Sequence, residues 1–299
     1  MTGILLMDKP RDWTSHDVVA KLRGLLRERR IGHAGTLDPL ATGLLTIFVG
    51  RATRAVEFAE VQEKTYIARL RLGLVTDTQD ITGRILHTCD TPVSRGELEA
   101  VLPRFLGEIQ QTPPMYSAIK VDGQRLYKLA RKGMEVERKA RPVTIRRLDI
   151  LAEGPDGFDL EITCSKGTYI RTLCHDMGQM LGVGGVMTAL QRTHVGAFSL
   201  QEAHTLAEIE AEADDRSRFL RPVDTLFASH PALALNAIQE QKLRNGQTIR
   251  LTTDAPGPVR VYSQTGEFLA LGEVTNRSGL ELRVKKSFFM PADSRAGKS

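Results

Sequence analysis

The chain has 299 residues, a length that accommodates two unequal domains, and 41% of them are hydrophobic. The formal net charge of +5 permits a polyanionic partner without requiring one. The three cysteines form no CxxC pair, which argues against a disulfide framework and fits a reducing compartment. Because no stretch reaches the apolar length of a membrane span and the start lacks a signal-peptide pattern, we expect a cytoplasmic protein without membrane contact.

The first expected elements surround a glycine-rich loop. Apolar side chains recur at helical spacing over 14–30, and Thr14 or Ser15 can cap this helix. The loop GHAGTLDPLATG (32–43) follows and holds one carboxylate, Asp38. Asp before Pro is ordinary turn chemistry, but a turn alone does not require flanking glycines and an upstream histidine. The run LLTIFVG behind the loop is expected to form a hydrophobic helix.

The middle of the chain alternates between strand and helix patterns. Apolar and polar side chains alternate over 65–74 and 157–167, which predicts half-buried strands. A capping box of Ser94 and Glu97 predicts a helix that Pro103 disturbs, and a helical apolar face covers 168–181. Because the strands alternate rather than run continuously apolar, we predict a mixed α+β domain with a mainly antiparallel sheet.

The composition changes near residue 231. Asn236 can cap a short helix, and Gly246 stands where a C-cap glycine belongs. Short strands separated by glycine-containing turns follow. We therefore expect a first domain over 1–230, a small β-rich domain over 231–292, and a disordered tail over 293–299.

Several common catalytic motifs are absent or incomplete. The loop lacks the Gly-Lys-Ser/Thr ending of a phosphate-binding loop, and Asp38 would repel a phosphate. The sequence SAIK matches a Ser-x-x-Lys motif, but the elements that accompany this motif in penicillin-binding enzymes are missing. The chain has no cysteine-pair zinc signature or His-Glu-x-x-His helix, so we expect no metal site.

A set of motifs resembles those of one enzyme family. The loop 32–43 resembles the catalytic motif of the TruB-type tRNA pseudouridine synthases. Further blocks are similar to the family's other motifs and occur in the family's order: DKPRDWTS, KTYIARLRLG with TDTQDITG, PPMYSAIKVDGQRLYKLARKG, CSKGTYIRTLCHDMG and LQRTHVGAF. The C-terminal part is similar to the PUA-like RNA-binding module of bacterial members. The resemblance therefore implies a pseudouridine-synthase domain over 1–230 and a PUA-like domain over 231–292.

The resemblance also implies a reaction and a substrate. Uridine would become pseudouridine in the T arm of tRNA, at uridine-55 in tRNA numbering. The enzyme must break a C–N glycosidic bond, turn the uracil over and rejoin it through carbon. No electrons are exchanged and no group is carried away, so no cofactor is expected. The partner would be tRNA, with the target uridine flipped out of its loop, and the enzyme would be a monomer.

By the resemblance, the chemistry centres on three residues. Asp38 is implied to be catalytic, either attacking the sugar or pyrimidine or removing a sugar proton, and each role needs an ionised, positioned carboxylate. Arg171 matches the family's active-site arginine and is expected to pair with Asp38 and keep it ionised. Tyr66 is expected to stack on the flipped uracil, and its hydroxyl to help remove the C5 proton.

Five further residues match supporting positions of the family. Tyr169 is expected to pack beside the arginine, and Leu190 to line the base pocket. Asp80 is expected to contact the uracil edge, and His33 to stack in the gap that the flipped uridine leaves. Lys9 would support the active-site loop or contact phosphate. We also expect the glycines of the loop to let backbone and nucleotide approach closely.

The segment 113–142 resembles the family's RNA-gripping insertion. Tyr116 and Tyr127 alternate with basic residues in it, an arrangement suited to clamping an RNA backbone. Without the resemblance, the segment would be interpreted as a solvated amphipathic helix. The basic residues expected to contact RNA are Lys120, Arg125, Lys128, Arg131 and Lys132.

Two alternatives remain open from the sequence. The basic insertion and the C-terminal module also suit a non-catalytic RNA-binding or tRNA-folding protein. A nucleoside or glycoside hydrolase could use Asp38 too, but such enzymes usually need a second carboxylate at a set separation, and the loop offers none.

Overall fold

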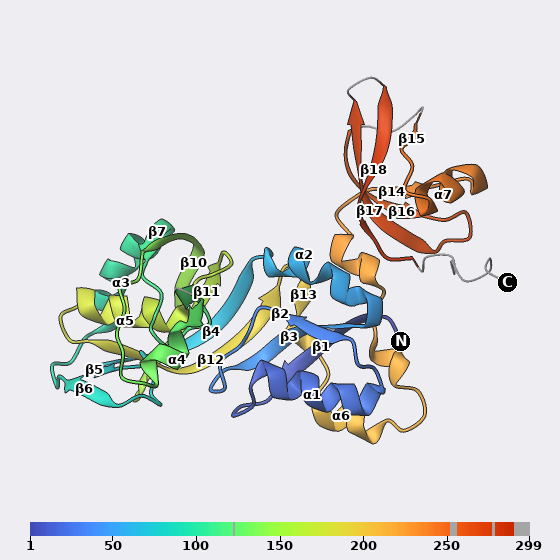
Figure 1. Cartoon of the computed structure of the whole chain (residues 1–299). Coiled ribbons are helices and arrows are strands. Elements are labelled where there is room, and N and C mark those ends of the chain that lie inside the picture. The colour runs from blue at the N-terminus through green and yellow to red at the C-terminus, as the bar shows by residue number, and fades with distance from the viewer. Residues whose placement is uncertain (122, 252–255, 277–278, 290–299) are drawn as a thin grey trace.

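A computed structural model describes residues 1–121, 123–251, 256–276 and 279–289 of the chain. The strands of its largest sheet are β1 (Gly3–Lys9), β2 (Ile31–Ala34), β3 (Thr42–Val49), β4 (Lys64–Leu72), β7 (Gly107–Gln111), β10 (Arg141–Gly154), β11 (Gly157–Cys164), β12 (Gly185–Val195) and β13 (Phe198–Ser199). Seven follow the order β1-β3-β12-β4-β11-β10-β7, while β2 pairs with β3 and β13 with β12 (Figure 1). Apart from β12 with β3, the paired strands are antiparallel. The predicted mixed, mainly antiparallel sheet is confirmed.

Helices lie at both ends of the sheet, and a further helix belongs to the C-terminal part. The α-helices are α1 (Ser15–Leu26), α2 (Val56–Glu60), α3 (Arg95–Val101), α4 (Leu126–Ala130), α5 (Ile170–Met180), α6 (Leu206–Ala211) and α7 (Ala237–Arg244). The 3-10 helices are η1 (Gly50–Ala55), η2 (Leu102–Phe105), η3 (Leu200–Glu202), η4 (Arg216–Phe219) and η5 (Val223–Phe227). Figure 1 shows α1 and α6 together at one end of the sheet, and α3, α4 and α5 at the other. In the described part of the chain, no helix has the length and apolar character needed to cross a membrane.

The capping residues that the sequence predicts for α1 and α3 are found at the starts of these helices. Thr14, not Ser15, caps α1, and it forms a capping box with Asp17. Ser94 and Glu97 form the predicted box at the start of α3. That helix ends at Val101, and the chain continues as the 3-10 helix η2 through Pro103, since proline cannot supply the amide that an α-helix requires.

The prediction of a helix over LLTIFVG is wrong, because these residues form most of strand β3. All but the first of its residues are buried. It pairs with β1 along its full length, and with β2 and β12 along its other edge. A central strand covered on both faces reads as a continuous apolar run, which periodicity alone does not distinguish from a buried helix.

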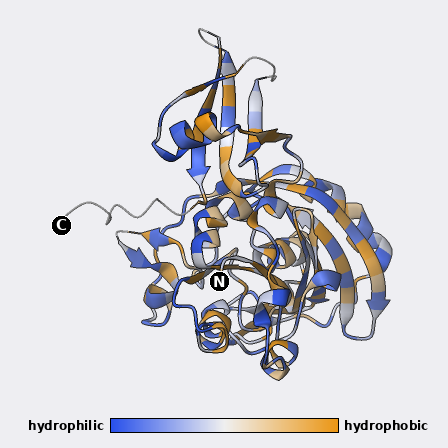
Figure 2. Ribbon diagram, turned by 90° about the vertical axis from the view of Figure 1, so that its right-hand side faces the viewer, coloured by the Kyte–Doolittle hydropathy of each residue, from blue (hydrophilic) through white to orange (hydrophobic). Residues whose placement is uncertain are grey.

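The two faces of β1 and β3 contribute to two separate cores. Leu5 and Met7 pack on the face covered by α1, in a core that extends to α5. Ile4 and Leu6 point the other way and pack with Phe227 and residues of the C-terminal part. Elsewhere in the sheet, Figure 2 shows orange hydrophobic and blue hydrophilic bands along the long strands. The first core surrounds the loop that carries Asp38.

The C-terminal part has a sheet and a core of its own. Its strands are β14 (Ala232–Ala234), β15 (Ile249–Arg250), β16 (Gly257–Tyr262), β17 (Phe268–Asn276) and β18 (Leu280–Ser287), in the order β14-β16-β17-β18-β15. The predicted β-rich C-terminal part is confirmed, and Asn236 caps α7 as expected. Phe268 and Phe288 pack against Phe227, with both pairs of ring centroids 6.1 Å apart. The boundary at 231 stays a prediction, and the tail 293–299 lies outside the described residues.

Two short hairpins branch from the larger sheet. They are β5 (Leu74–Thr76) with β6 (Ile85–Thr88), and β8 (Lys120–Val121) with β9 (Gln124–Arg125). The first lies beside β12 and carries the turn with Asp80. The second lies within the insertion and leads into α4.

Gly43, at the start of β3, is predicted to be intolerant of any side chain. Its φ is +94°, and an added Cβ would lie 2.4 Å from the Arg192 carbonyl oxygen. Gly43→Ala should therefore lower the free energy of unfolding by at least about 2 kcal/mol, through combined strain and overpacking. Urea denaturation measures this change.

Gly24→Ala serves as the matched control. Gly24 lies within α1, and an added Cβ there would meet no atom within 4 Å. The control should raise the free energy of unfolding by about 1 kcal/mol, since alanine favours a helix more than glycine does. Equal effects of the two substitutions would contradict the assignment of Gly43 as a close-approach position.

Candidate active site

Asp38 projects from the short loop between β2 and β3. Leu37 and Leu40 beside it are buried and anchor the loop in the core. The Leu37 amide donates to Ser15 Oγ at 2.9 Å, and this hydroxyl donates back to the Leu37 carbonyl at 3.2 Å. The carbonyl of Asp38 accepts from the amide of Ala41 at 3.0 Å. The backbone is thus held tightly while the Asp38 side chain stays 41% exposed.

The Lys9 side chain contacts the backbone of this loop from the buried side. Its ammonium is fully buried and donates to the carbonyls of Pro10 and Trp13, both at 2.7 Å, and to that of Pro39 at 3.5 Å. Of the two expected roles, these contacts favour support of the loop, because the side chain does not reach the surface; the role itself stays a prediction. Burial lowers the pKa of Lys9 to about 8.

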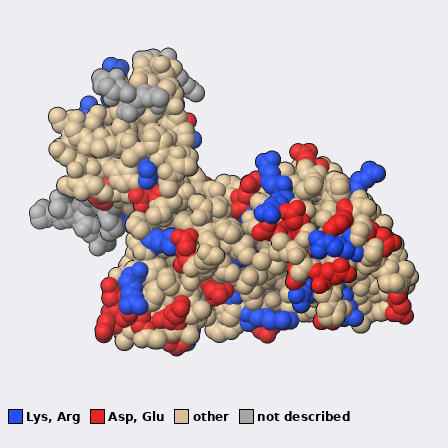
Figure 3. Space-filling model, turned by 180° about the vertical axis from the view of Figure 1, so that it is seen from behind, with Lys and Arg blue, Asp and Glu red and all other residues tan. Residues whose placement is uncertain are grey.

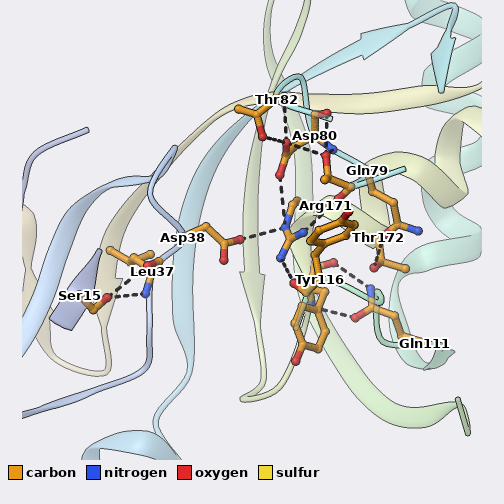
Figure 4. A network of polar contacts seen from close by, with 12 residues as sticks. Ser15, Leu37, Asp38, Gln79, Asp80, Thr82, Gln111, Tyr116, Arg171 and Thr172 are labelled. Carbon is orange, nitrogen blue, oxygen red and sulfur yellow. Dashed lines mark hydrogen bonds and ion pairs between the residues drawn. The ribbon is translucent and has the colours of Figure 1, made fainter. Parts of the chain in front are cut away.

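Arg171 forms an ion pair with Asp38, as the sequence predicts. It is the second residue of α5, and its side chain is only 6% exposed. Nε lies 2.9 Å from Asp38 Oδ2 (Figure 4). Nη1 donates to the Thr78 carbonyl at 3.0 Å, and Nη2 to the Tyr116 carbonyl at 2.9 Å. The guanidinium is therefore locked in one orientation, and it holds the Asp38 carboxylate in place.

A second carboxylate, Asp80, reaches the same arginine. Its Oδ2 lies 3.8 Å from Arg171 Nε, although the two residues are far apart in the sequence. Its Oδ1 accepts hydrogen bonds from the Thr78 hydroxyl at 2.9 Å and the Thr82 hydroxyl at 2.6 Å. The loop lacks a second acid, but the fold supplies one. The side chain is 8% exposed and heavily bonded, so it is suited to hold structure more than to attack a substrate.

Tyr66 and Leu190 form the apolar side of the site. Both are buried in the core that also contains Leu37 and Leu40. Tyr66 on β4 stands opposite Arg192 on β12. Burial raises the pKa of the Tyr66 hydroxyl, which outweighs the opposing charge of Arg192. The side chain is therefore a neutral phenol at pH 7.

Tyr169 precedes α5 directly and lies next to Arg171 in the chain. The side-chain amide of Gln111 brackets its backbone, because Nε2 donates to the Tyr169 carbonyl at 3.0 Å and Oε1 accepts from its amide at 2.7 Å. Burial raises the pKa of the Tyr169 hydroxyl. The expected packing beside Arg171 agrees with this position, and the start of α5 is fixed to β7.

His33 lies on β2, opposite Ile47 of β3. Its Nδ1 is buried without a hydrogen-bond partner among the described residues. Burial lowers the pKa of the imidazole, and the charge of Arg192 lowers it further. The ring is therefore neutral at pH 7, a state that suits stacking better than charge pairing, although its expected role against a flipped base stays a prediction.

The basic insertion has a small core of its own. Leu126 and Leu129 of α4 pack with Met115, so the segment is more than a solvated helix. Arg125 and Arg131 stand over the ring of Tyr127, with 6.0 and 5.6 Å from guanidinium carbon to ring centroid. All five predicted contact residues are exposed: Lys120, Arg125, Lys128, Arg131 and Lys132. They are separate from the Asp38 cluster, to which the insertion is tied through the Tyr116 carbonyl.

Comparison with known proteins agrees with this arrangement. Residues 23–170 match the family model of the TruB family pseudouridylate synthase N-terminal domain. Residues 171–228 and 231–283 match models of the tRNA pseudouridylate synthase B C-terminal domain and the pseudouridine synthase II TruB C-terminal region. The chain is 46% identical over 283 residues to the tRNA pseudouridine synthase B of Pseudomonas aeruginosa (strain UCBPP-PA14), covering 92% of this chain and 93% of that protein. The chain belongs to the TruB family of tRNA pseudouridine synthases.

Other TruB-family proteins and solved structures support the match. The chain is 42% identical over 272 residues to the tRNA pseudouridine synthase B of Lactobacillus delbrueckii subsp. bulgaricus (strain ATCC BAA-365 / Lb-18), covering 88% of this chain and 91% of that protein. An H/ACA RNP structure bound to a substrate RNA containing 2′-deoxyuridine has a TM-score of 0.72 at 22% identity, over 97% of this chain and 86% of that chain. A Cbf5-Nop10-Gar1 complex has a TM-score of 0.72 at 24% identity, over 96% and 85%. These structures share the fold, and the family match makes the chain an isomerase.

Three supporting residues of this TruB-family site were not singled out from the sequence. Arg192 is buried and donates to the carbonyls of Gly35 and Leu44, at either end of the loop. A charged residue at an inward position of the alternating strand 190–198 was the available signal. Ser15 and Gln111 act on backbone groups distant in the sequence, so no local pattern marks them. Within the described ranges, no cluster of three or more His, Cys, Asp or Glu side chains is arranged to hold a metal ion.

Lys9→Met tests the buried ammonium under the loop. The carbonyls of Pro10 and Trp13 lose their donor, so the free energy of unfolding at pH 7 should fall by about 2 kcal/mol. The pKa of Lys9 is about 8 in the folded chain and 10.5 when exposed, so the unfolded chain binds more protons between these values. The wild type should therefore gain stability relative to the variant as the pH rises from 8 to 10.5.

Urea denaturation of both proteins at pH 7, 9 and 10 measures this difference. Lys21→Met is the control, because Lys21 is partly exposed and pairs with Glu210 at 2.7 Å. Its effect should be small, as for most surface ion pairs. A Lys9→Met difference that stays constant across the pH series would contradict the buried-cation assignment.

Proposed function

We propose that the chain converts uridine to pseudouridine in the T loop of tRNA, at uridine-55 in tRNA numbering, with Asp38 as the catalytic residue. One observation carries the proposal. A partly exposed carboxylate stands on a rigid loop and is oriented by a buried arginine, Arg171, at 2.9 Å. Such a group is accessible to a flipped-out nucleotide and is already in a defined position. From the family resemblance we also propose that the enzyme acts as a monomer.

The reaction needs few protein groups. The bond between the ribose C1′ and the uracil N1 breaks, the uracil turns over, and a bond forms between C1′ and C5. C5 then loses its proton to solvent while N1 takes one up, so the product has the mass of the substrate. Asp38 either attacks the sugar or pyrimidine or takes a sugar proton. Both routes use an oriented carboxylate, and the ion pair with Arg171 supplies this orientation.

The neighbouring residues supply a surface for the uracil. Tyr66 offers an aromatic face for stacking, and Leu190 lies on the same apolar side. Burial raises the pKa of Tyr66, so its hydroxyl is protonated at pH 7 and its ring is the more useful part. His33 is neutral and accessible enough to replace a base in the RNA stack. Oδ1 of Asp80 is occupied by the threonines and Oδ2 faces Arg171, so a contact with the uracil edge would use Oδ2 beside that arginine.

The insertion supplies the grip on RNA. Its five exposed cations and Tyr127 form a compact basic surface linked to Arg171 through the Tyr116 carbonyl. On the face seen from behind, Figure 3 shows basic and acidic side chains interspersed over the larger part. A polyanion therefore finds a local patch rather than a continuous basic face. The C-terminal β-rich part, which we propose to be a PUA-like module, would add contacts outside the T loop.

Asp38→Asn should reduce turnover by at least about 10⁴-fold, because the amide neither attacks nor removes a proton. T-arm RNA labelled with tritium at uracil C5 gives the measurement, since each isomerisation releases the label. RNA binding, measured by filter retention, should stay within a few-fold of the wild type. Asp149→Asn is the control, because Asp149 is an exposed acid on β10 that pairs with Arg147.

Two outcomes would contradict the assignment. An Asp38→Asn enzyme that releases tritium at the wild-type rate would remove Asp38 from the chemistry. Loss of the base from the RNA, seen by mass spectrometry, would indicate a hydrolase instead. An RNA of unchanged mass together with tritium release identifies isomerisation.

Neutralising the insertion should weaken RNA binding without affecting the chemical step. The double variant Lys128→Gln/Arg131→Gln should raise Kd for the RNA by about 10-fold. It should also reduce the slope of log K against log salt by about 1.5, because fewer counterions are released on binding when two phosphate contacts are lost. The rate at saturating RNA should stay within about 2-fold of the wild type. Arg95→Gln/Arg104→Gln is the control, with Arg95 at the start of α3 and Arg104 in η2. Equal salt slopes in both doubles would count against the insertion as the RNA grip.

A further inference from the structure

Arg192 is a buried cation beside the site with no established part in the reaction. It lies on β12 and is 1% exposed. Among the described residues, no carboxylate lies within 4.0 Å of its guanidinium. Burying a charge without a counter-ion is costly unless polar groups compensate. The compensating groups therefore indicate what the residue does.

The guanidinium is bonded to both ends of the loop that carries Asp38. Nη2 donates to the Gly35 carbonyl at 2.9 Å, where the chain leaves β2. Nε donates to the Leu44 carbonyl at 2.7 Å, where β3 begins. A planar guanidinium presents its donors at set angles, so it ties the two carbonyls together in one geometry. A lysine has no equivalent fork.

The backbone of Arg192 reinforces the same clamp. It pairs with Gly43 in the parallel contact between β12 and β3. The backbone approach is so close that a Cβ on Gly43 would lie 2.4 Å from the Arg192 carbonyl oxygen and one on Gly35 would lie 3.1 Å from Nη1. Two glycines of the loop, Gly35 and Gly43, thus allow the close approach of Arg192. Both ends of the loop are adapted to this one residue.

The importance of this clamp follows from how Asp38 meets its substrate. Arg171 orients the carboxylate at the end of the Asp38 side chain. Arg192 acts instead on the backbone from which this side chain extends. Both must be in place, because a misplacement of about 1 Å can cost about 10²-fold in rate.

We propose that Arg192 is a positioning residue for the isomerisation: its buried guanidinium clamps both ends of the catalytic loop and so sets the position of Asp38. The inference rests on the proposed catalytic role of Asp38. Besides burial, the charge of Arg192 contributes to lowering the pKa of Lys9, Lys64 and His33.

The experiment compares Arg192→Lys and Arg192→Met with the wild type under single-turnover conditions, using T-arm RNA labelled at C5. Arg192→Met should lower the rate constant by about 10²-fold, with Kd for the RNA within about 3-fold. Arg192→Lys keeps the charge but bonds at most one end of the loop, so its rate should fall between those of the wild type and Arg192→Met. Circular dichroism confirms that each variant is folded at the assay temperature.

Arg216→Met is the matched control. Arg216 also uses its guanidinium on backbone carbonyls, since Nε donates to Ile209 at 2.9 Å and Nη1 to Leu25 at 3.0 Å, and it ties α6 to α1 away from the loop. Its loss should lower the melting temperature while leaving the single-turnover rate unchanged. If Arg192 had only a structural role, Arg192→Met would likewise lower the melting temperature and leave the single-turnover rate unchanged.

A single-turnover rate within 2-fold of the wild type in either folded Arg192 variant would overturn the proposal. So would a fall in rate that Arg216→Met reproduces. If Arg192→Met does not fold, Arg192→Lys decides, because it keeps the charge and most of the volume. Failure of the proposed function is a different result: Asp38→Asn would then keep turnover, whatever the Arg192 variants do.

Discussion

The ion pair between Asp38 and Arg171 is the contact on which the arrangement of the site depends. Arg171 joins three segments that are distant in the sequence: the loop with Asp38, the turn with Thr78, and the insertion with Tyr116. A rigid, planar guanidinium satisfies three acceptors only when all three are in place. The site therefore exists only when β3, the β5–β6 hairpin and the insertion are assembled around α5.

A second principle is the use of buried cations on backbone carbonyls. Lys9 is bonded to the carbonyl groups under the loop, and Arg192 to those at its ends. Lys64 donates in the same way to the carbonyls of Glu60 and Gln62 before β4. A turn can bury backbone carbonyl oxygens that no backbone amide reaches. A buried carbonyl without a hydrogen-bond donor destabilises the folded state. A cation supplies several donors at once, so it stabilises a tight irregular loop without adding a carboxylate that would compete with Asp38.

Much of the fold was predictable because its signals are local. Capping boxes and apolar periodicity mark α1 and α3, and alternation marks β4 and β11, since each depends on neighbours a few residues away. The strand β3 was predicted as a helix because its burial on both faces removes the alternation. The motif around Asp38 and the one around Arg171 were recognisable as a pair only through the family resemblance, not through any spacing rule.

The sequence by itself determined the family, the mixed antiparallel class, the loop with one carboxylate and the basic insertion, because all of these are written in contiguous residues. Only the tertiary structure decided that Asp80 shares Arg171 with Asp38, that Lys9 is buried under the loop, and that Arg192 holds both loop ends. These contacts join residues up to 157 positions apart. Their partners are mostly backbone carbonyls, which every residue carries, so no side-chain pattern in the sequence marks them in advance.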